Sequence, residues 1–451
     1  MTAPPSERAR RAADRVLPAL VAAGSSLPYG LLALRNFARF EMRSWDLAIF
    51  EQAVAGYAGL GAPIVDVKGP GFNILGDHFS PATALLAPAY RLFPAAQTLL
   101  IAQVLLIGWA SYVVTALAVR RLGLAVGVTL GLCCALSFGV QSAVDAEFHE
   151  VAFAAPLLAL AGAAWVERRW TAVAAWSVPL VFVKEDLGLT VMVVGGLLWW
   201  AGQRKLGLIT AGCGLAGFVL AVLVVLPNVN DAGRYAYVGT LGGEAGVVET
   251  LLAEPWTKLT TVLLTFAITG FAAWFSPWAL VVVPTFAWRF VGDVPYYWGT
   301  DWHYSLVLMP VVFCAAVEAM ERRPRLRWAA PLAAGVTVVT LFGSPLSTLL
   351  DADTYRDTPR AEAGRAAVAL IPEGASVETD IALLGHVVTG HQAYWTGTIG
   401  DVVPEYVLFD TSAGLGSPAD PAAWAQSEHG GAWREVFSKN GVVLAERLTA
   451  R

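Results

Sequence analysis

Long apolar segments alternate with short polar gaps over most of the chain. The segments are long enough to cross a bilayer, since a membrane-spanning helix needs about 20 mostly apolar residues. Arg and Lys gather in every second gap, as at Arg120 and Arg121 and in the run ERRPRLR at 321–327, whereas His and carboxylates occupy the others. Basic gaps mark the cytoplasmic face by the positive-inside rule. The remaining gaps therefore form one polar surface on the outer side.

This alternation predicts about eleven membrane-spanning helices, with the N-terminus in the cytoplasm and the C-terminus outside. The predicted spans lie at about 16–36, 95–119, between Arg121 and DAEFHE, then at 151–166, 171–183, 187–201 and 206–226, twice within 260–290, and at 304–320 and 328–349. Large external loops are expected at 37–81, 227–258 and 291–303. In the first loop, the helical spacing of Phe50, Val54 and Tyr57 predicts an amphipathic helix along the membrane surface.

The last hundred or so residues have a different pattern. Apolar runs shorten, and the strand-like segments VETDIALLGHV (377–387), YVLFD (406–410) and GVVLAERL (441–448) alternate with turn formers. A helical stretch is expected near 359–370. The fold class predicted is therefore an all-α polytopic membrane bundle over residues 1–349, followed by a small external α/β domain over residues 350–451.

Composition supports an integral membrane protein and excludes a soluble globular one. Of the residues 56% are hydrophobic and 14% are charged, and the mean hydropathy is +0.58, whereas soluble domains have about 25% charged residues. The net charge of -5 carries little information because the signs are segregated by side. No nucleic-acid partner is expected. The four cysteines lie inside apolar runs without CxxC spacing, which predicts neither disulfides nor a thiolate metal site.

Two carboxylates of the first external loop are candidates for acid–base chemistry. Asp46 and Glu51 are five residues apart, so on a helix they project in different directions. A carboxylate beside apolar neighbours such as Trp45 and Phe50 would have its proton affinity raised by desolvation, which suits a general base. An ordinary solvated interfacial helix explains the same residues equally well.

Histidines mark three external gaps. His78 lies in GDHFSP, His149 lies in EFHE beside Glu150, and His303 lies in GTDWHY. His149 and Glu150 are plausible ligands for a divalent cation such as Mg or Mn, although helix capping also accounts for the acid. His78 is a candidate for binding phosphate, a metal or a substrate hydroxyl, and His303 is either a capping residue or a substrate contact. All three fall on the same predicted side near span ends, which favours one shared site.

The segment KEDLGL interrupts an otherwise apolar stretch with Lys184, Glu185 and Asp186. Charges near a bilayer are usually paired or functional, but a short turn whose charges face water is the simpler alternative. If the site handles a lipid phosphate, Lys184 is a candidate point charge for it, and Arg289 is a second.

Four segments carry a resemblance to a known family: DLAIFEQAV, GDHFSPATALLAP, EFHEVAFAAPLLALA and VKEDLGL. In this order they resemble an uncharacterised family of bacterial and archaeal polytopic membrane proteins defined by a domain of unknown function. That family is similar to the GT-C superfamily of membrane glycosyltransferases, which use polyprenyl-phosphate sugars and carry a catalytic acid in the first external loop. The resemblance implies an external active site with Asp46 as the acid and Glu51 as second choice. The usual acidic pair is absent, because Trp45 precedes Asp46.

The expected function is therefore inverting sugar transfer from a polyprenyl-phosphate donor to a glycan, lipid or protein acceptor at the outer face of the plasma membrane. Asp46 would act as the base, and Lys184 and Arg289, with His78, would stabilise the departing phosphate. Two other classes remain open. A secondary transporter or flippase would carry charges near the bilayer midplane, and a non-catalytic scaffold for envelope assembly would tolerate loss of Asp46.

Overall fold

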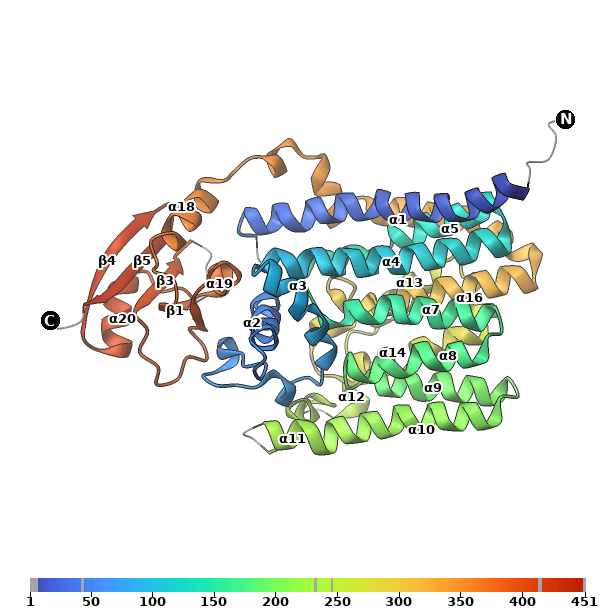
Figure 1. Cartoon of the computed structure of the whole chain (residues 1–451), viewed down its shortest axis with the longest axis horizontal. Coiled ribbons are helices and arrows are strands. Elements are labelled where there is room, and N and C mark those ends of the chain that lie inside the picture. Colours follow the sequence, from blue (N-terminus) through green and yellow to red (C-terminus); the bar gives the residue numbers. More distant parts are fainter. Residues whose placement is uncertain (1–6, 42–43, 231–232, 245, 413–415, 449–451) are drawn as a thin grey trace.

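The computed structural model describes residues 7–41, 44–230, 233–244, 246–412 and 416–448. It is a bundle of helices with a small sheet domain at one end, and α1 begins at the opposite end of the bundle (Figure 1). Residues 42–43, within the predicted loop 37–81, and residues 231–232 and 245, within the predicted loop 227–258, lie outside the described residues.

The bundle is formed by helices from the first three quarters of the chain. They are α1 (Glu7–Ala38), α2 (Asp46–Ala58), α3 (Ala87–Leu92), α4 (Ala96–Leu122), α5 (Leu124–Ala135), α6 (Phe138–Asp145), α7 (Ala154–Val166), α8 (Trp170–Ser177), α9 (Leu187–Trp200), α10 (Arg204–Leu220), α11 (Leu226–Val229), α12 (Val247–Leu252), α13 (Pro255–Ala267), α14 (Val283–Val291), α15 (Pro295–Trp298), α16 (Leu308–Arg322) and α17 (Ala329–Leu341).

The predicted number of about eleven spans is not confirmed. Within the described ranges, four helical segments are long and apolar enough to cross a membrane, and a fifth is added if the pair Pro295–Ser305 and Leu308–Arg322, bent by 68°, is one span. The four are Arg15–Ala38, Ala96–Leu122, Leu124–Asp145 and Arg204–Val229. Other predicted spans are shorter apolar helices, such as Leu187–Trp200. Breaks at polar or proline-containing junctions divide the apolar runs into these shorter pieces.

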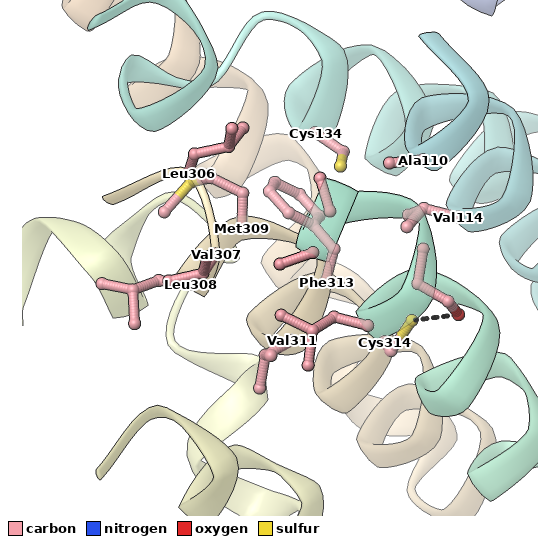
Figure 2. Close-up of a cluster of buried hydrophobic side chains, with 14 of the residues drawn as sticks. Ala110, Val114, Cys134, Leu306, Val307, Leu308, Met309, Val311, Phe313 and Cys314 are labelled. Atoms are coloured by element: carbon pink, nitrogen blue, oxygen red, sulfur yellow. Dashed lines mark hydrogen bonds between the residues drawn. The ribbon is translucent and has the colours of Figure 1, made fainter. Parts of the chain in front are cut away.

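Helix α16 forms the centre of the bundle. Its residues from Leu308 to Met320 are all buried, so neighbouring segments cover it on every side. Figure 2 shows its side chains beside Ala110 and Val114 of α4 and Cys134 of α5. The thiol of Cys314 donates a hydrogen bond to the Ala159 carbonyl at 3.7 Å, which ties α16 to α7 (Figure 2).

Helices α9 and α10 approach each other closely through glycines. A Cβ atom on Gly214 would lie 2.5 Å from the carbonyl oxygen of Gly188, and one on Gly195 would lie 2.3 Å from the backbone nitrogen of Ala211. Small residues allow helix backbones to pack this tightly in membranes. Because α9 begins directly after Lys184, Glu185 and Asp186, this contact fixes where that charged segment lies.

The C-terminal part is a five-stranded sheet, within the described ranges, with three accompanying helices. Its elements are α18 (Pro359–Val368), β1 (Ser376–Thr379), α19 (Ile381–Val387), β2 (Gln392–Trp395), β3 (Tyr406–Asp410), α20 (Pro421–His429), β4 (Ala432–Lys439) and β5 (Val442–Leu448). The strand order is β2-β1-β3-β5-β4, with β1 parallel to β2 and β3, and β5 antiparallel to β3 and β4.

The small sheet of the sequence prediction is present, but one strand was predicted too long. The segment 377–387 leaves β1 at Thr379 and continues as α19, because the Asp380 side chain accepts the Leu383 N–H and caps the helix. Sequence analysis also missed β2 and β4. The predicted domain boundary at residue 349/350 stays a prediction.

Helix α2 connects the bundle with the sheet domain. Phe50 and Val54 pack into the core of the bundle, whereas Ile49 and Ala53 pack into the core that includes the sheet. The Gln52 side-chain amide donates to the Ala393 carbonyl of β2 at 2.9 Å. The helix predicted in the first loop therefore exists, but its apolar residues contact protein on both sides.

We predict that Gly214→Ala destabilises the protein by about 1–3 kcal/mol, because the new methyl group would meet the Gly188 backbone. Gly212, in the same helix, has open space where its Cβ would lie, and Gly212→Ala should be neutral or slightly stabilising through helix propensity. Melting temperatures of both variants in detergent test this expectation. Equal melting temperatures would contradict it.

Candidate active site

A cavity of about 470 Å³ lies where the bundle meets the loop 37–81. Its wall includes residues from α2, from the loop before α3, from the junctions before α7 and α9, and from the segment between α14 and α16. Eight of the ten candidate residues predicted from the sequence line the cavity. Those that line it are Asp46, His78, His149, Glu150, Lys184, Glu185, Asp186 and His303.

Asp46 and His149 form the central contact of the cavity. Asp46 is the first residue of α2, and its side chain is 29% exposed. The Nε2 atom of His149 lies 3.3 Å from Oδ2 of Asp46. On its other side the His149 ring stacks on His303, with 3.5 Å between ring centroids. Three segments far apart in the sequence thus meet at one carboxylate.

The buried side chain of Gln103, in α4, positions the His149 segment. Its amide nitrogen donates to the carbonyls of Ala143 and Glu147, at 2.9 and 2.6 Å, and its oxygen accepts the His149 backbone N–H at 2.9 Å. One polar side chain inside a spanning helix therefore satisfies three buried backbone groups. Sequence analysis did not select Gln103.

The Asp46 carboxyl remains ionised at neutral pH. Burial raises its pKa, but the charge of His149, hydrogen bonds from His149 and Ser44, and the charge of Lys184 together lower the pKa to about 2. The raised proton affinity expected from the sequence is therefore wrong for Asp46. As a base, Asp46 would act as an ionised carboxylate with one partly exposed side.

The KED segment provides two ion pairs. The Lys184 ammonium lies 2.8 Å from Oε1 of Glu150. Glu185 lies 2.9 Å from Nδ1 of His78, and it also accepts the Phe79 backbone N–H at 3.0 Å and the Tyr235 hydroxyl at 2.9 Å. Charges near a bilayer are usually paired or functional, and here they join three polar gaps.

A second cation, Lys68, reaches the cavity from the loop 37–81. It pairs with Asp77, which also accepts the Tyr237 hydroxyl at 3.2 Å. The Tyr237 ring stacks on His78, with 4.7 Å between centroids. Sequence analysis missed Lys68 and both tyrosines of the 233–244 segment, because single polar residues within long loops give no periodic signal.

Aromatic side chains form the rest of the wall. They are Trp45, Phe50, Phe218, Tyr235, Tyr237, Trp288, Tyr296, Tyr297, Trp302 and Tyr304. Four of them, Tyr296, Tyr297, Trp302 and Tyr304, come from the run RFVGDVPYYWGTDWHY, which leads from α14 into η10 (His303–Ser305). The high aromatic content of this segment was a usable signal for a binding wall.

Two predicted residues do not line the cavity. Glu51 is 0% exposed and lies between bundle and sheet domain, where it accepts hydrogen bonds from the hydroxyls of Tyr90 and Thr389. Arg289 is also 0% exposed, and its guanidinium donates to the carbonyls of Tyr297 and Gly299. Arg289 therefore shapes the aromatic segment from behind.

The predicted pair of metal ligands has other partners. Within the described residues, no three His, Cys, Asp or Glu side chains are arranged to hold a metal ion. His149 faces Asp46, and Glu150 is neutralised by Lys184. A Mg or Mn site at His149 and Glu150 stays a prediction.

The model of one protein family, described as "Predicted membrane protein (DUF2079)", matches residues 37–444. The chain belongs to this family. The match includes the four segments that carried the resemblance, and it identifies this DUF2079 chain as a membrane protein. None of the curated proteins matches it significantly.

The DUF2079 chain has the fold of a structure described as "Crystal Structure of ArnT from Cupriavidus metallidurans bound to Undecaprenyl phosphate". The TM-score is 0.56, the sequences are 12% identical, and the match covers 96% of this chain and 98% of that one. The predicted similarity to GT-C membrane glycosyltransferases is thereby confirmed at the level of the fold.

We predict that Glu51→Gln removes a pH dependence of stability. Burial raises the pKa of Glu51 to about 7, in spite of the Thr389 and Tyr90 hydrogen bonds. Because the folded-state pKa lies above the unfolded one, the native protein loses stability as the pH rises from the unfolded pKa to about 7. Glutamine keeps the acceptor oxygen without the charge.

The melting temperature of the native protein in detergent should therefore fall between about pH 5 and about pH 8, by an amount corresponding to about 3 kcal/mol at most. Glu51→Gln should lack the part of this decrease in melting temperature that comes from the Glu51 carboxyl. If native protein and Glu51→Gln show the same pH dependence, the Glu51 carboxyl is ionised in the interface and the expectation is wrong.

Proposed function

We propose that this DUF2079 protein is a membrane glycosyltransferase that moves a sugar from a polyprenyl-phosphate donor to a hydroxyl group, with inversion, at the outer face of the plasma membrane. The observation that carries the proposal is the Asp46–His149 contact, which faces paired Lys184, Lys68 and His78 across one cavity. The ArnT-like fold supports it, because the neighbour of known structure was crystallised with undecaprenyl phosphate.

The reaction would be a single displacement. The acceptor hydroxyl loses its proton to the Asp46 carboxylate while its oxygen attacks the anomeric carbon. The bond from this carbon to the phosphate oxygen breaks, and its electron pair leaves with the polyprenyl phosphate. Attack opposite the leaving group inverts the anomeric centre. His149 would hold the Asp46 carboxylate in position.

Lys184 and His78 would stabilise the charge on the departing phosphate, together with Lys68. Preorganised cations act most strongly where charge develops in the transition state. Each of these three is already held by a carboxylate, Glu150, Glu185 or Asp77, so little reorganisation is needed when the phosphate arrives.

The lipid tail of the donor would leave the cavity on the side of α9 and α10. Leu189 and Phe218 line the cavity there, and α10 exposes apolar side chains such as Leu208 and Leu215 on its outer surface. Exposed apolar helix faces in a membrane protein contact lipid tails. A polyprenyl chain could therefore stay in the bilayer while its phosphate sits in the cavity.

We predict that purified protein in nanodiscs releases polyprenyl phosphate from a polyprenyl-phosphate sugar when membrane extract supplies the acceptor. Asp46→Asn should reduce the rate by about 100-fold to 10,000-fold, because it removes the proton acceptor while keeping the side-chain shape. The same carboxylate-to-amide change at Glu51, which does not line the cavity, should retain most of the turnover.

Loss of turnover in Glu51→Gln instead of Asp46→Asn would refute the assignment of the base. A product with retained anomeric configuration would refute the single displacement. Donor movement across the bilayer without sugar transfer, unchanged in Asp46→Asn, would favour a flippase.

A further inference from the structure

A small recess adjoins the main cavity. Its volume is about 10 Å³, which is room for one water-sized group. It shares five wall residues with the cavity, namely Lys184, Asp186, Trp288, His303 and Tyr304. Val151, Leu187 and Val307 form apolar parts of its other sides, and Thr285 completes the wall. A group that enters the recess from the cavity is therefore enclosed by protein.

Three residues of the recess carry a buried polar atom without a hydrogen-bond partner inside the described ranges. These atoms are Oδ1 of Asp186, Nε1 of Trp288 and Nδ1 of His303. His303 is only 6% exposed. Buried polar groups in native proteins are nearly always satisfied, so three in one recess point to a polar group that completes them.

The chemistry of the three atoms restricts that group. The indole N–H of Trp288 only donates, and an ionised Asp186 oxygen only accepts. An ammonium group cannot accept from Trp288, and a phosphate or carboxylate cannot donate to Asp186. A hydroxyl group does both, as a water molecule does, and the size of either fits the recess.

We propose that the recess is a recognition site for one hydroxyl group of the donor sugar. The hydroxyl donates to Oδ1 of Asp186 and accepts from Nε1 of Trp288, with His303 beside it. This inference rests on the proposed function and extends it, since it makes the recess the part of the cavity that distinguishes one sugar from another. Lys184, which lines both the recess and the cavity, would hold the phosphate that carries this sugar.

Sites built to hydrogen-bond a substrate hydroxyl discriminate strongly against analogues that lack it, because the buried partners are then left unpaired. A methyl or methylene group in the same position would leave Asp186 and Trp288 unsatisfied. The recess therefore predicts that one specific deoxy position on the sugar is strongly disfavoured, while the others have small effects.

Binding is the primary measurement. The full-length protein in nanodiscs is titrated with undecaprenyl-phosphate esters of glucose, galactose, mannose and arabinose, with undecaprenyl phosphate as the baseline. The ester that binds most tightly is then compared with its monodeoxy analogues. We expect one deoxy position to weaken binding by about 10-fold to 100-fold, and Trp288→Phe to reduce that ratio to nearly one.

The matched control is Trp274→Phe, an exposed tryptophan outside the cavity, which should keep the ratio of the native protein. If Trp288→Phe does not fold, Asp186→Asn serves instead and should lower the same ratio, because a neutral acceptor binds a hydroxyl more weakly than a charged one.

The outcomes distinguish the proposal of a hydroxyl recess from the proposal of a glycosyltransferase. If the esters bind and no deoxy position matters, the recess holds only water and this inference is overturned, whereas the transferase proposal stands. If one position matters and depends on Trp288 but no sugar is transferred, the recess is confirmed and the transferase proposal fails. If no ester binds better than undecaprenyl phosphate, the recess does not recognise a donor sugar.

Discussion

The site depends on how α2 is held, because α2 carries Asp46 on its first turn. Phe50 and Val54 anchor the helix in the bundle core, and Ile49 and Ala53 anchor it in the core of the sheet domain. A short helix alone is marginal in water, so its orientation comes from these two surfaces. The distance of 3.3 Å between Asp46 and His149 is therefore a product of both parts of the chain, although neither residue belongs to the sheet domain.

The charges of the cavity are arranged as pairs that span different segments. Lys184 with Glu150 joins the junctions before α9 and α7, and His78 with Glu185 joins the loop 37–81 to the junction before α9. Removing charges from water costs free energy that an ion pair only partly recovers. Such pairs are weak evidence for stability, but they define positions accurately. An arriving phosphate would find cations that already have fixed geometry, which is the arrangement that transition-state stabilisation requires.

Sequence patterns predicted which segments meet, but not which side chains share the cavity. His78, His149 and Lys184 were selected because charge and histidine in external gaps are conspicuous between apolar runs. Asp46 and Glu51 were predicted to point in different directions, as five residues along a helix rotate by about 140°. Which of them faces the cavity depends on the docked sheet domain, through Thr389, and no local pattern encodes that contact.

Lys68 and Gln103 were not predicted as site residues, because their roles come from tertiary hydrogen bonds and ion pairs. The length of β1 was overestimated because an apolar run, residues 381–384, continues past Asp380, whose cap starts a helix.

The same arrangement explains how one cavity could serve two substrates of opposite solubility. Its wall at Leu189 and Phe218 belongs to helices that expose apolar side chains, whereas its wall at Lys68 and Tyr237 belongs to polar loops. A lipid-linked donor would approach from the apolar side and a hydrophilic acceptor from the loops, so their reacting atoms would meet near Asp46. Arg289 supports this geometry from behind the wall, where its guanidinium satisfies the carbonyls of Tyr297 and Gly299. A buried cation thus fixes the aromatic segment without entering the cavity, which leaves the charge balance of the cavity to Lys68, Lys184 and their carboxylates.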